Sequence, residues 1–207
     1  MPEIKAVTFD LGRVMVRLDT SGEKFGGLMR AVGAEPDKAL GTFWNTEEVQ
    51  AFMTGKLFPA DFHLAVRRRY GITHTFPEFA EAWCDLFSPM PGMADLFTAV
   101  SQRCGIGILS DTDPLHWDRI RLVSPCVEIA ARPTLSHLVG SLKPHPDMYR
   151  AAVDNAGVPA EHCLFIDDLQ KNVDGARESG LEAVRFEGAE KLARDLAEME
   201  IISQNML

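Results

Sequence analysis

Ile4-Lys5-Ala6-Val7-Thr8-Phe9-Asp10 is a short run rich in apolar, β-branched and aromatic residues, and it breaks at Gly12. This pattern predicts a buried strand followed by a loop. In open parallel sheets, ligands bind just beyond the carboxyl ends of the strands. We therefore expect Asp10, where the run stops, to lie at the ligand-binding edge of a sheet.

Three later apolar runs follow the same pattern, and a helical segment precedes each of them. The runs are Ile106–Leu109, Leu164–Ile166 and Ala183–Phe186, and the helices run from Met93 to about Arg103, from about Asp147 to Asn155, and up to Gly180. Another amphipathic helix closes the chain. Strands that alternate with helices predict an α/β fold, a Rossmann-like parallel sheet flanked by helices.

Residues 23–87 show helical periodicity and no obvious strand. Four helices are predicted, and the last is expected to carry Phe79, Trp83, Leu86 and Phe87. The simplest architecture is a discontinuous core, residues 1–17 and 90–207, with a small all-helical cap at 18–89. The aromatic residues of this insert, Trp44, Phe52 and Trp83, have helical spacing and are expected in its core.

The composition limits the partners. Apolar residues make up 46% of the 207-residue chain, charged residues 25%, and the formal net charge is −9. Nucleic acids and anionic membranes need a clustered basic surface, and the single run Arg67-Arg68-Arg69 reads as a solvated helix face. No stretch approaches the roughly 18 apolar residues of a membrane span, and no signal peptide is visible. We expect a cytoplasmic protein without nucleic-acid or membrane partners.

Polar residues follow each predicted strand. The second run stops at Ser110-Asp111-Thr112-Asp113, the run at Leu164–Ile166 stops at Asp167-Asp168, and Lys143 lies just before a helix. Each alone fits a turn or a helix cap. Together at one sheet edge they would form an anionic cluster that a cation must balance, and carboxylate oxygens suit Mg²⁺. A hydroxyl and a lysine nearby suit the oxygens of a phosphate group.

These segments resemble, in order, the four signature motifs of the haloacid dehalogenase superfamily. The motifs are Val7–Val14, Ile108-Leu109-Ser110-Asp111, Lys143-Pro144, and Phe165-Ile166-Asp167-Asp168 with Asn172. The spacing fits, since Ser110 follows Asp10 by 100 residues, Lys143 follows Ser110 by 33, and Asp167 follows Lys143 by 24. The resemblance covers the whole chain, and the insert resembles the small helical cap of one branch.

The resemblance implies an enzyme, a Mg²⁺-dependent phosphatase acting on small phosphate esters. It assigns Asp10 as nucleophile and metal ligand, with the Gly12 carbonyl as a second ligand. Asp168 is the expected direct acidic ligand, and Asp167 the outer partner. The remaining site residues are Ser110, the Asp111 backbone and Lys143, which would hold the phosphate, and Asn172, which would orient Lys143 or its loop.

One position departs from the family pattern. Most phosphatases of the superfamily carry a second aspartate, the general acid and base, where this chain has Gly12. General acid catalysis contributes on the order of 10²–10⁴-fold. A subgroup similar to the bacterial α-glucose-1-phosphate phosphatases shares Asp-Leu-Gly, and a sugar phosphate offers a good leaving group. The candidate substitute acids are Asp19, Asp113, His116 and His145, of which His145 is the best placed because it follows the Lys143-Pro144 turn, although loop or surface hydrogen bonding is the simpler explanation for each.

Two other functions stay open. A 2-haloacid dehalogenase also attacks through the first aspartate and lacks the second, but it uses no metal and carries no paired carboxylate like Asp167-Asp168. A catalytically weak binding or regulatory protein on the same fold would explain Gly12 as decay, but it would not require Asp10, Ser110, Lys143 and Asp168. A phosphomutase is disfavoured, because returning a phosphoryl group to a substrate hydroxyl depends most heavily on the general acid and base that Gly12 replaces.

Overall fold

A five-stranded parallel sheet forms the centre of the protein. The computed structural model describes residues 3–35 and 42–203. The strands are β1 (Ala6–Phe9), β4 (Gly105–Ser110), β5 (Thr134–Leu135), β6 (Cys163–Asp167) and β7 (Glu182–Arg185), in the order β5-β4-β1-β6-β7. All four neighbouring pairs are parallel. The predicted α/β fold is confirmed.

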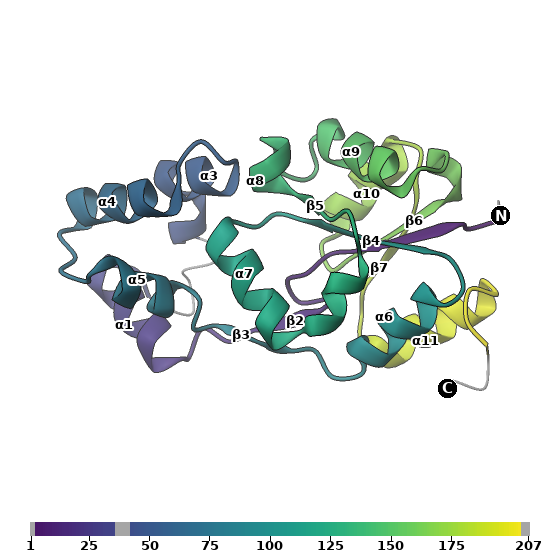
Figure 1. The fold of residues 1–207 in the computed structure, drawn as a ribbon, viewed down its shortest axis with the longest axis horizontal. Coiled ribbons are helices and arrows are strands. Elements are labelled where there is room, and N and C mark those ends of the chain that lie inside the picture. Colours follow the sequence, from purple (N-terminus) through teal and green to yellow (C-terminus); the bar gives the residue numbers. More distant parts are fainter. Residues whose placement is uncertain (1–2, 36–41, 204–207) are drawn as a thin grey trace.

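Helices cover both faces of this sheet (Figure 1). One face packs against α6 (Met93–Ser101), α7 (Pro114–Val123) and α11 (Ala189–Glu198), and the other against α9 (Pro146–Ala156) and α10 (Gln170–Glu178). Successive strand residues point to opposite faces. Val7 and Phe9 therefore join the first apolar cluster, while Ala6 joins the second. The short elements of this half are η3 (Pro125–Ile129), α8 (Ser136–Val139) and η4 (Ala160–His162).

A second group of helices lies to one side of the sheet (Figure 1). It comprises α1 (Glu23–Ala31), η2 (Phe43–Asn45), α3 (Glu47–Met53), α4 (Pro59–Tyr70) and α5 (Phe76–Trp83), which we call the helical layer. The layer has its own apolar cluster, whose buried members run from Phe25 to Leu86. The division into a core at 1–17 and 90–207 and a cap at 18–89 stays a prediction.

Two short antiparallel strands at the junction were not predicted. β2 (Val16–Leu18) pairs with β3 (Phe87–Pro89), so that Leu18 lies opposite Phe87. The expectation that the last helix of the insert continues through Leu86 and Phe87 is wrong, because α5 ends at Trp83. Pairing between segments so distant in sequence leaves no local pattern. Within the described ranges, no helix is long and apolar enough to cross a membrane.

Candidate active site

Three neighbouring strands bring polar residues to one edge of the sheet. Asp10 directly follows β1, Ser110 ends β4, and Asp167 ends β6. The backbone N–H of Asp10 donates to the carbonyl of Ile166 at 2.9 Å, so the chain keeps its sheet register one residue beyond β1. Because parallel strands end at the same edge, these residues gather where a ligand can reach them.

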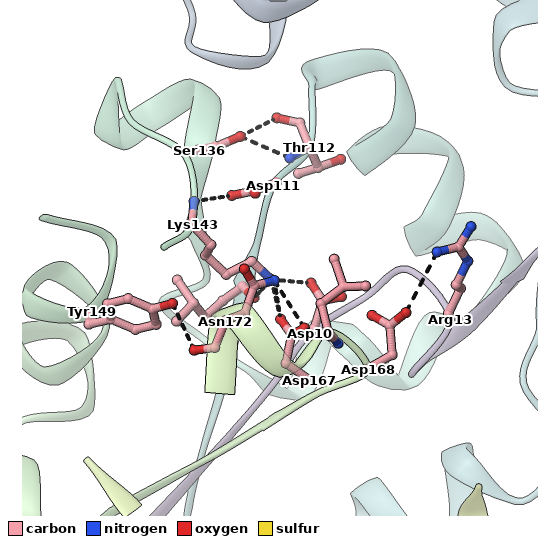
Figure 2. Close-up of polar contacts among 12 residues, drawn as sticks. Asp10, Arg13, Asp111, Thr112, Ser136, Lys143, Tyr149, Asp167, Asp168 and Asn172 are labelled. Carbon is pink, nitrogen blue, oxygen red and sulfur yellow. Dashed lines mark hydrogen bonds and ion pairs between the residues drawn. The ribbon is translucent and has the colours of Figure 1, made fainter. Parts of the chain in front are cut away.

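Lys143 joins the first and last of these strand ends. Its ammonium group donates to Asp10 Oδ1 and to Asp167 Oδ2, both at 2.7 Å, and to the carbonyl of Leu109 at 3.2 Å (Figure 2). Burial alone would lower the pKa of Lys143, but Asp10, Asp167 and Asp111 outweigh it and raise that pKa above its usual range. Lys143 is therefore a fixed positive charge.

Asp10, Asp167 and Asp168 form a carboxylate cluster, and each offers an oxygen within 4.8 Å of the others. Burial raises the pKa of Asp10 to about 7, against the opposing effect of Lys143 and with a further increase from Asp167. Burial and then Asp167 also raise the pKa of Asp168. The cluster thus holds more negative charge than its surroundings stabilise, and its all-oxygen donor set fits a divalent cation such as Mg²⁺.

Asp167 and Asp168 have different surroundings. Asp167 is fully buried, and it accepts hydrogen bonds from Lys143, from the N–H of Leu169 at 2.8 Å, and from Asn172 Nδ2 at 3.0 Å to each oxygen. Asn172 therefore bonds Asp167, a contact that was not predicted, and the expected role of Asn172 in orienting Lys143 or its loop stays a prediction. The carboxylate of Asp168 is 18% exposed, and its ion-pair partner is Arg13, at 3.7 Å. Asp168 is the more available of the two for an incoming ligand.

Arg13 was not predicted as a site residue. It follows Gly12 directly and adopts a φ of 60°, a backbone conformation that few residues other than glycine take. Its half-exposed guanidinium and the ammonium of Lys143 flank the carboxylate cluster from opposite sides (Figure 2). Its position beside Gly12 in the first motif was the only signal available in the sequence.

The loop after β4 is fixed by contacts that the sequence did not reveal. Asp111 Oδ1 accepts from the backbone N–H of Lys143 at 2.9 Å. The Ser136 hydroxyl accepts from the N–H of Thr112 at 2.8 Å and lies 2.7 Å from the carbonyl of Met53. Burial raises the pKa of Asp111. The Asp111 carboxylate thus holds the lysine loop, while Ser110 remains on the cavity wall.

A cavity of about 70 Å³ lies between these strand ends and the helical layer. The sheet side contributes Gly12, Ser110 and Asp111, and the layer contributes Trp44 and Met53. Phe52 and Trp83 are buried as predicted, and Trp44, which is only partly buried, packs against the same cluster by stacking on Trp83 and also lines the cavity. The three clustered aspartates are not among the lining residues of this cavity, although Leu11 and Gly12, which follow Asp10, are, and they line none of the larger cavities elsewhere, of about 350, 430, 440 and 690 Å³.

None of the four candidate substitute acids presents a free acid to the cavity. Asp19 is exposed and bonded to Ser21, Asp113 is fully buried, and the exposed His145 lies beside Asp147. Only His116 lines the cavity, but both of its ring nitrogens already face protein acceptors, Asp113 Oδ2 at 2.9 Å and the Trp83 carbonyl at 3.0 Å.

The family model for haloacid dehalogenase-like hydrolases matches residues 4–180. The chain belongs to this family. The family and the hydrolytic enzyme class predicted from the four motifs are therefore confirmed, while the subgroup with Asp-Leu-Gly stays a prediction.

This haloacid dehalogenase-like hydrolase is similar to several known proteins. It is 24% identical over 204 residues to a D-ribitol-5-phosphate phosphatase of Bacteroides thetaiotaomicron, covering 93% of this chain and 97% of the relative. A HAD family enzyme from the same organism, solved with magnesium and inorganic phosphate, has a TM-score of 0.74 at 23% identity, over 89% of this chain and 95% of that one. An L-2-haloacid dehalogenase from Xanthobacter autotrophicus has a TM-score of 0.63 at 21% identity, over 98% of this chain and 86% of that one. At these identities the two structures share the fold.

Proposed function

We propose that this haloacid dehalogenase-like hydrolase is a Mg²⁺-dependent phosphatase that acts on small phosphate monoesters through a phosphorylated Asp10. The observation that carries the proposal is the carboxylate cluster of Asp10, Asp167 and Asp168, with Lys143 bound to two of its members. A relative that covers nearly the whole chain bears the name of a phosphatase, which supports the same reaction.

Different residues of the site would bind the cation and the phosphate group. Asp10, Asp168 and the Gly12 carbonyl would hold the cation, and Asp167, whose oxygens are engaged by Lys143 and Asn172, would support them from behind. When bound, Mg²⁺ would keep the carboxylates ionised and neutralise charge on the phosphoryl group. Lys143 orients Asp10 through Oδ1 and, with Ser110 and the Asp111 backbone, would bind phosphate oxygens.

The reaction has two steps. A carboxylate oxygen of Asp10 attacks phosphorus, and the bond from phosphorus to the ester oxygen breaks. The leaving alcohol takes its proton from solvent, because Gly12 has no side chain that could donate one. Water then attacks the phosphorus of the acyl phosphate, which releases phosphate and restores the carboxylate of Asp10. Covalent catalysis of this kind replaces one difficult displacement with two easier ones.

The cavity favours a leaving group without negative charge. The wall carries the Asp111 carboxylate and, among the described residues, no lysine or arginine, and the ring nitrogens of His116, which also lines it, already face protein acceptors. A cavity of about 70 Å³ is much smaller than the roughly 300–1,000 Å³ of typical ligand pockets. A sugar or polyol phosphate, the substrate class that we favour, therefore requires the helical layer to move away and close again.

The test is a screen of phosphorylated metabolites with and without Mg²⁺. The panel holds α-glucose 1-phosphate, D-ribitol 5-phosphate, glucose 6-phosphate and 4-nitrophenyl phosphate, with a 2-chloro acid to test for dehalogenation. We expect phosphate release that requires Mg²⁺ and falls more than about 10³-fold in Asp10→Asn, as for the loss of a nucleophile. Asp19→Asn, which removes an exposed carboxylate away from the cavity, is the matched control and should retain activity.

Two results would reject the proposal. Halide release that survives EDTA would identify a dehalogenase. Equal, slow hydrolysis by the parent and by Asp10→Asn would identify a binding protein.

A further inference from the structure

Arg13 brings a positive charge to the active site that the motifs did not predict. Its Nη1 lies 3.7 Å from Asp168 Oδ2, which is an ion pair but too long for a hydrogen bond, and its side chain is 51% exposed. Figure 2 shows this guanidinium on the Asp168 side of the carboxylate cluster and Lys143 on the other side. The charge of Arg13 is therefore close to the site but loosely held.

The backbone fixes the position from which the Arg13 side chain extends. Its φ is 60°, and its N–H donates to the carbonyl of Val16 at 2.7 Å in the turn that follows Gly12. This conformation favours glycine, and residues that adopt it in spite of the strain are characteristic of functional sites. The long side chain can therefore change its partner while its Cα stays beside the cluster.

Lys143 has no free donor in this structure. An ammonium group carries three hydrogens, and Lys143 donates to Asp10, to Asp167 and to the carbonyl of Leu109. A phosphate oxygen can therefore bind this lysine only in place of one of these acceptors. The side chain of Arg13 has five N–H donors, and none of them has an acceptor at hydrogen-bond distance in the described part of the chain.

A second arginine near Asp168 has different surroundings. Arg185 ends β7, and its Nε donates to the backbone carbonyl of Asp168 at 3.2 Å, so the main chain anchors it. The cavity wall itself has no lysine or arginine among its described residues. Arg13 is therefore the arginine that faces the carboxylate of Asp168.

A divalent cation and Arg13 would share the same carboxylate. Asp168 is the more exposed member of the acidic pair and the expected direct ligand, and Arg13 is its ion-pair partner. With a cation bound there, the guanidinium would face a like charge and would need another anion. The proposed reaction brings a phosphate group to this place, and a planar guanidinium matches two phosphate oxygens at once.

We propose that Arg13 is a phosphate-binding residue, whose guanidinium pairs with Asp168 as in this structure and with the phosphate group once a divalent cation is bound. The identity of the anion rests on the proposed phosphatase function, whereas the competition for Asp168 rests on the contacts of Arg13 itself. Arg13 therefore acts with opposite signs on the two ligands. It weakens the binding of the cation alone, and it strengthens the binding of phosphate afterwards.

Isothermal titration calorimetry tests both signs, with Mg²⁺ alone and with inorganic phosphate at saturating Mg²⁺. In Arg13→Gln we expect phosphate to bind about 10- to 100-fold more weakly than in the parent, as for the loss of hydrogen bonds to a charged group. Mg²⁺ alone should bind about two- to fivefold more tightly, because Asp168 loses a weak, exposed ion pair. Unchanged phosphate affinity, or a loss of Mg²⁺ affinity as large as the loss of phosphate affinity, would overturn the proposal.

Two further variants separate a direct contact from the general effect of charge. Arg185→Gln removes a positive charge near the same aspartate without removing the proposed contact, and it should change phosphate affinity much less than Arg13→Gln. Arg13→Lys keeps the charge but loses the planar fork, so its phosphate affinity should lie between those of the parent and Arg13→Gln. Equal losses in Arg13→Gln and Arg185→Gln would overturn the proposal.

NMR of protein labelled with ¹⁵N in its arginines gives a readout that does not depend on turnover. The Arg13 Nε–H signal, assigned with Arg13→Gln, should shift when phosphate is added in the presence of Mg²⁺, and an unshifted signal would contradict the contact. A parent protein that binds phosphate through Arg13 but hydrolyses no ester rejects the proposed function alone. Hydrolysis of 4-nitrophenyl phosphate with the same kcat/KM in the parent and in Arg13→Gln rejects the role of Arg13 alone.

Discussion

A glycine stands two residues after the proposed nucleophile, although the local structure does not require one. Gly12 has no positive φ, and a Cβ built on it would meet only Leu18 Cδ1, at 3.8 Å. Sterics and backbone conformation therefore do not explain the missing side chain at this position. Because Gly12 cannot donate a proton, we expect protonation of the leaving group to limit the rate of hydrolysis.

Replacing Gly12 with aspartate should supply the missing acid. We expect Gly12→Asp to accelerate hydrolysis of glucose 6-phosphate, a poor leaving group, by up to the 10²–10⁴-fold typical of general acid catalysis, and to change 4-nitrophenyl phosphate hydrolysis much less. The ratio of kcat/KM for the two substrates is the measurement. Gly12→Asn has the same shape without the acid and should not accelerate. Equal effects of both variants would contradict this explanation.

Single residues were predictable where chemistry and strand ends coincide. Asp10, Ser110, Lys143 and the Asp167-Asp168 pair all follow apolar runs or turns, and the structure brings Asp10, Lys143, Asp167 and Asp168 into one contact network. Their roles in catalysis stay predictions. Ser136 and Tyr149 could not be found in the same way, because they act through backbone atoms of distant loops and leave no spacing to recognise.

At the scale of elements, α10 lies unusually close to the lysine loop. A Cβ on Gly175, within α10, would lie 2.7 Å from Pro144 Cβ and 2.9 Å from the Tyr149 hydroxyl. Pro144 directly follows Lys143, and Tyr149 donates to the carbonyl of Asn172 at 2.8 Å. The missing side chain lets this helix pack directly against the lysine loop and Tyr149, beside Lys143 and Asn172, whose side chains both bond Asp167.

Gly175→Ala should therefore impair the site more than the fold. The extra methyl overpacks the contact, at a cost of about 1–3 kcal/mol, while alanine favours the helix by about 1 kcal/mol. We expect a small net loss in the free energy of unfolding and a fall in kcat of roughly 10- to 100-fold, because small displacements of catalytic groups are costly. Denaturant titration and steady-state kinetics measure the two effects.

Gly27→Ala is the control for helix propensity. Gly27 lies inside α1, and a Cβ there meets nothing within 4 Å. It should stabilise the protein by up to about 1 kcal/mol and leave kcat unchanged. A Gly175→Ala enzyme with the parent's kcat would show that the lysine loop does not depend on this contact.

Long periodic elements were predictable, and short or non-local ones were not. The strands β1, β4, β6 and β7 and their helices follow local patterns. β5 has only two residues, and β2 and β3 depend on each other across the whole insert. The start of α7 did carry a signal, since Pro114 follows Asp113, which caps the helix by accepting from the N–H of His116.

At the scale of the molecule, the helical layer contacts α8 through α3 as well as α7 through α5. There the Ser136 hydroxyl lies 2.7 Å from the Met53 carbonyl, and a Cβ on Gly55 would lie 2.1 Å from the carbonyl oxygen of His137. The layer can seat this closely only because Gly55 has no side chain. We therefore expect closure over the substrate to depend on this contact.

Gly55→Ala should prevent this seating. Both Gly55, with a φ of 70°, and Gly71, with a φ of 69°, are left-handed, but a Cβ on Gly71 meets nothing within 4 Å. Each alanine variant should lose about 1–2 kcal/mol of stability through backbone strain. Only Gly55→Ala should also lower kcat/KM, by roughly tenfold or more, because the layer cannot close. Equal kcat/KM values in the two variants would argue against closure at this contact.

The most direct test of the central claim is to trap the phosphorylated enzyme. The reaction of the parent protein with 4-nitrophenyl phosphate and Mg²⁺ is quenched in acid within one turnover, and its peptides are analysed by mass spectrometry. We predict that the peptide containing Asp10 carries phosphate. This phosphate should be absent when EDTA is present and absent in the Asp10→Asn protein. Turnover with no phosphate on Asp10, or with phosphate on another residue, would contradict it.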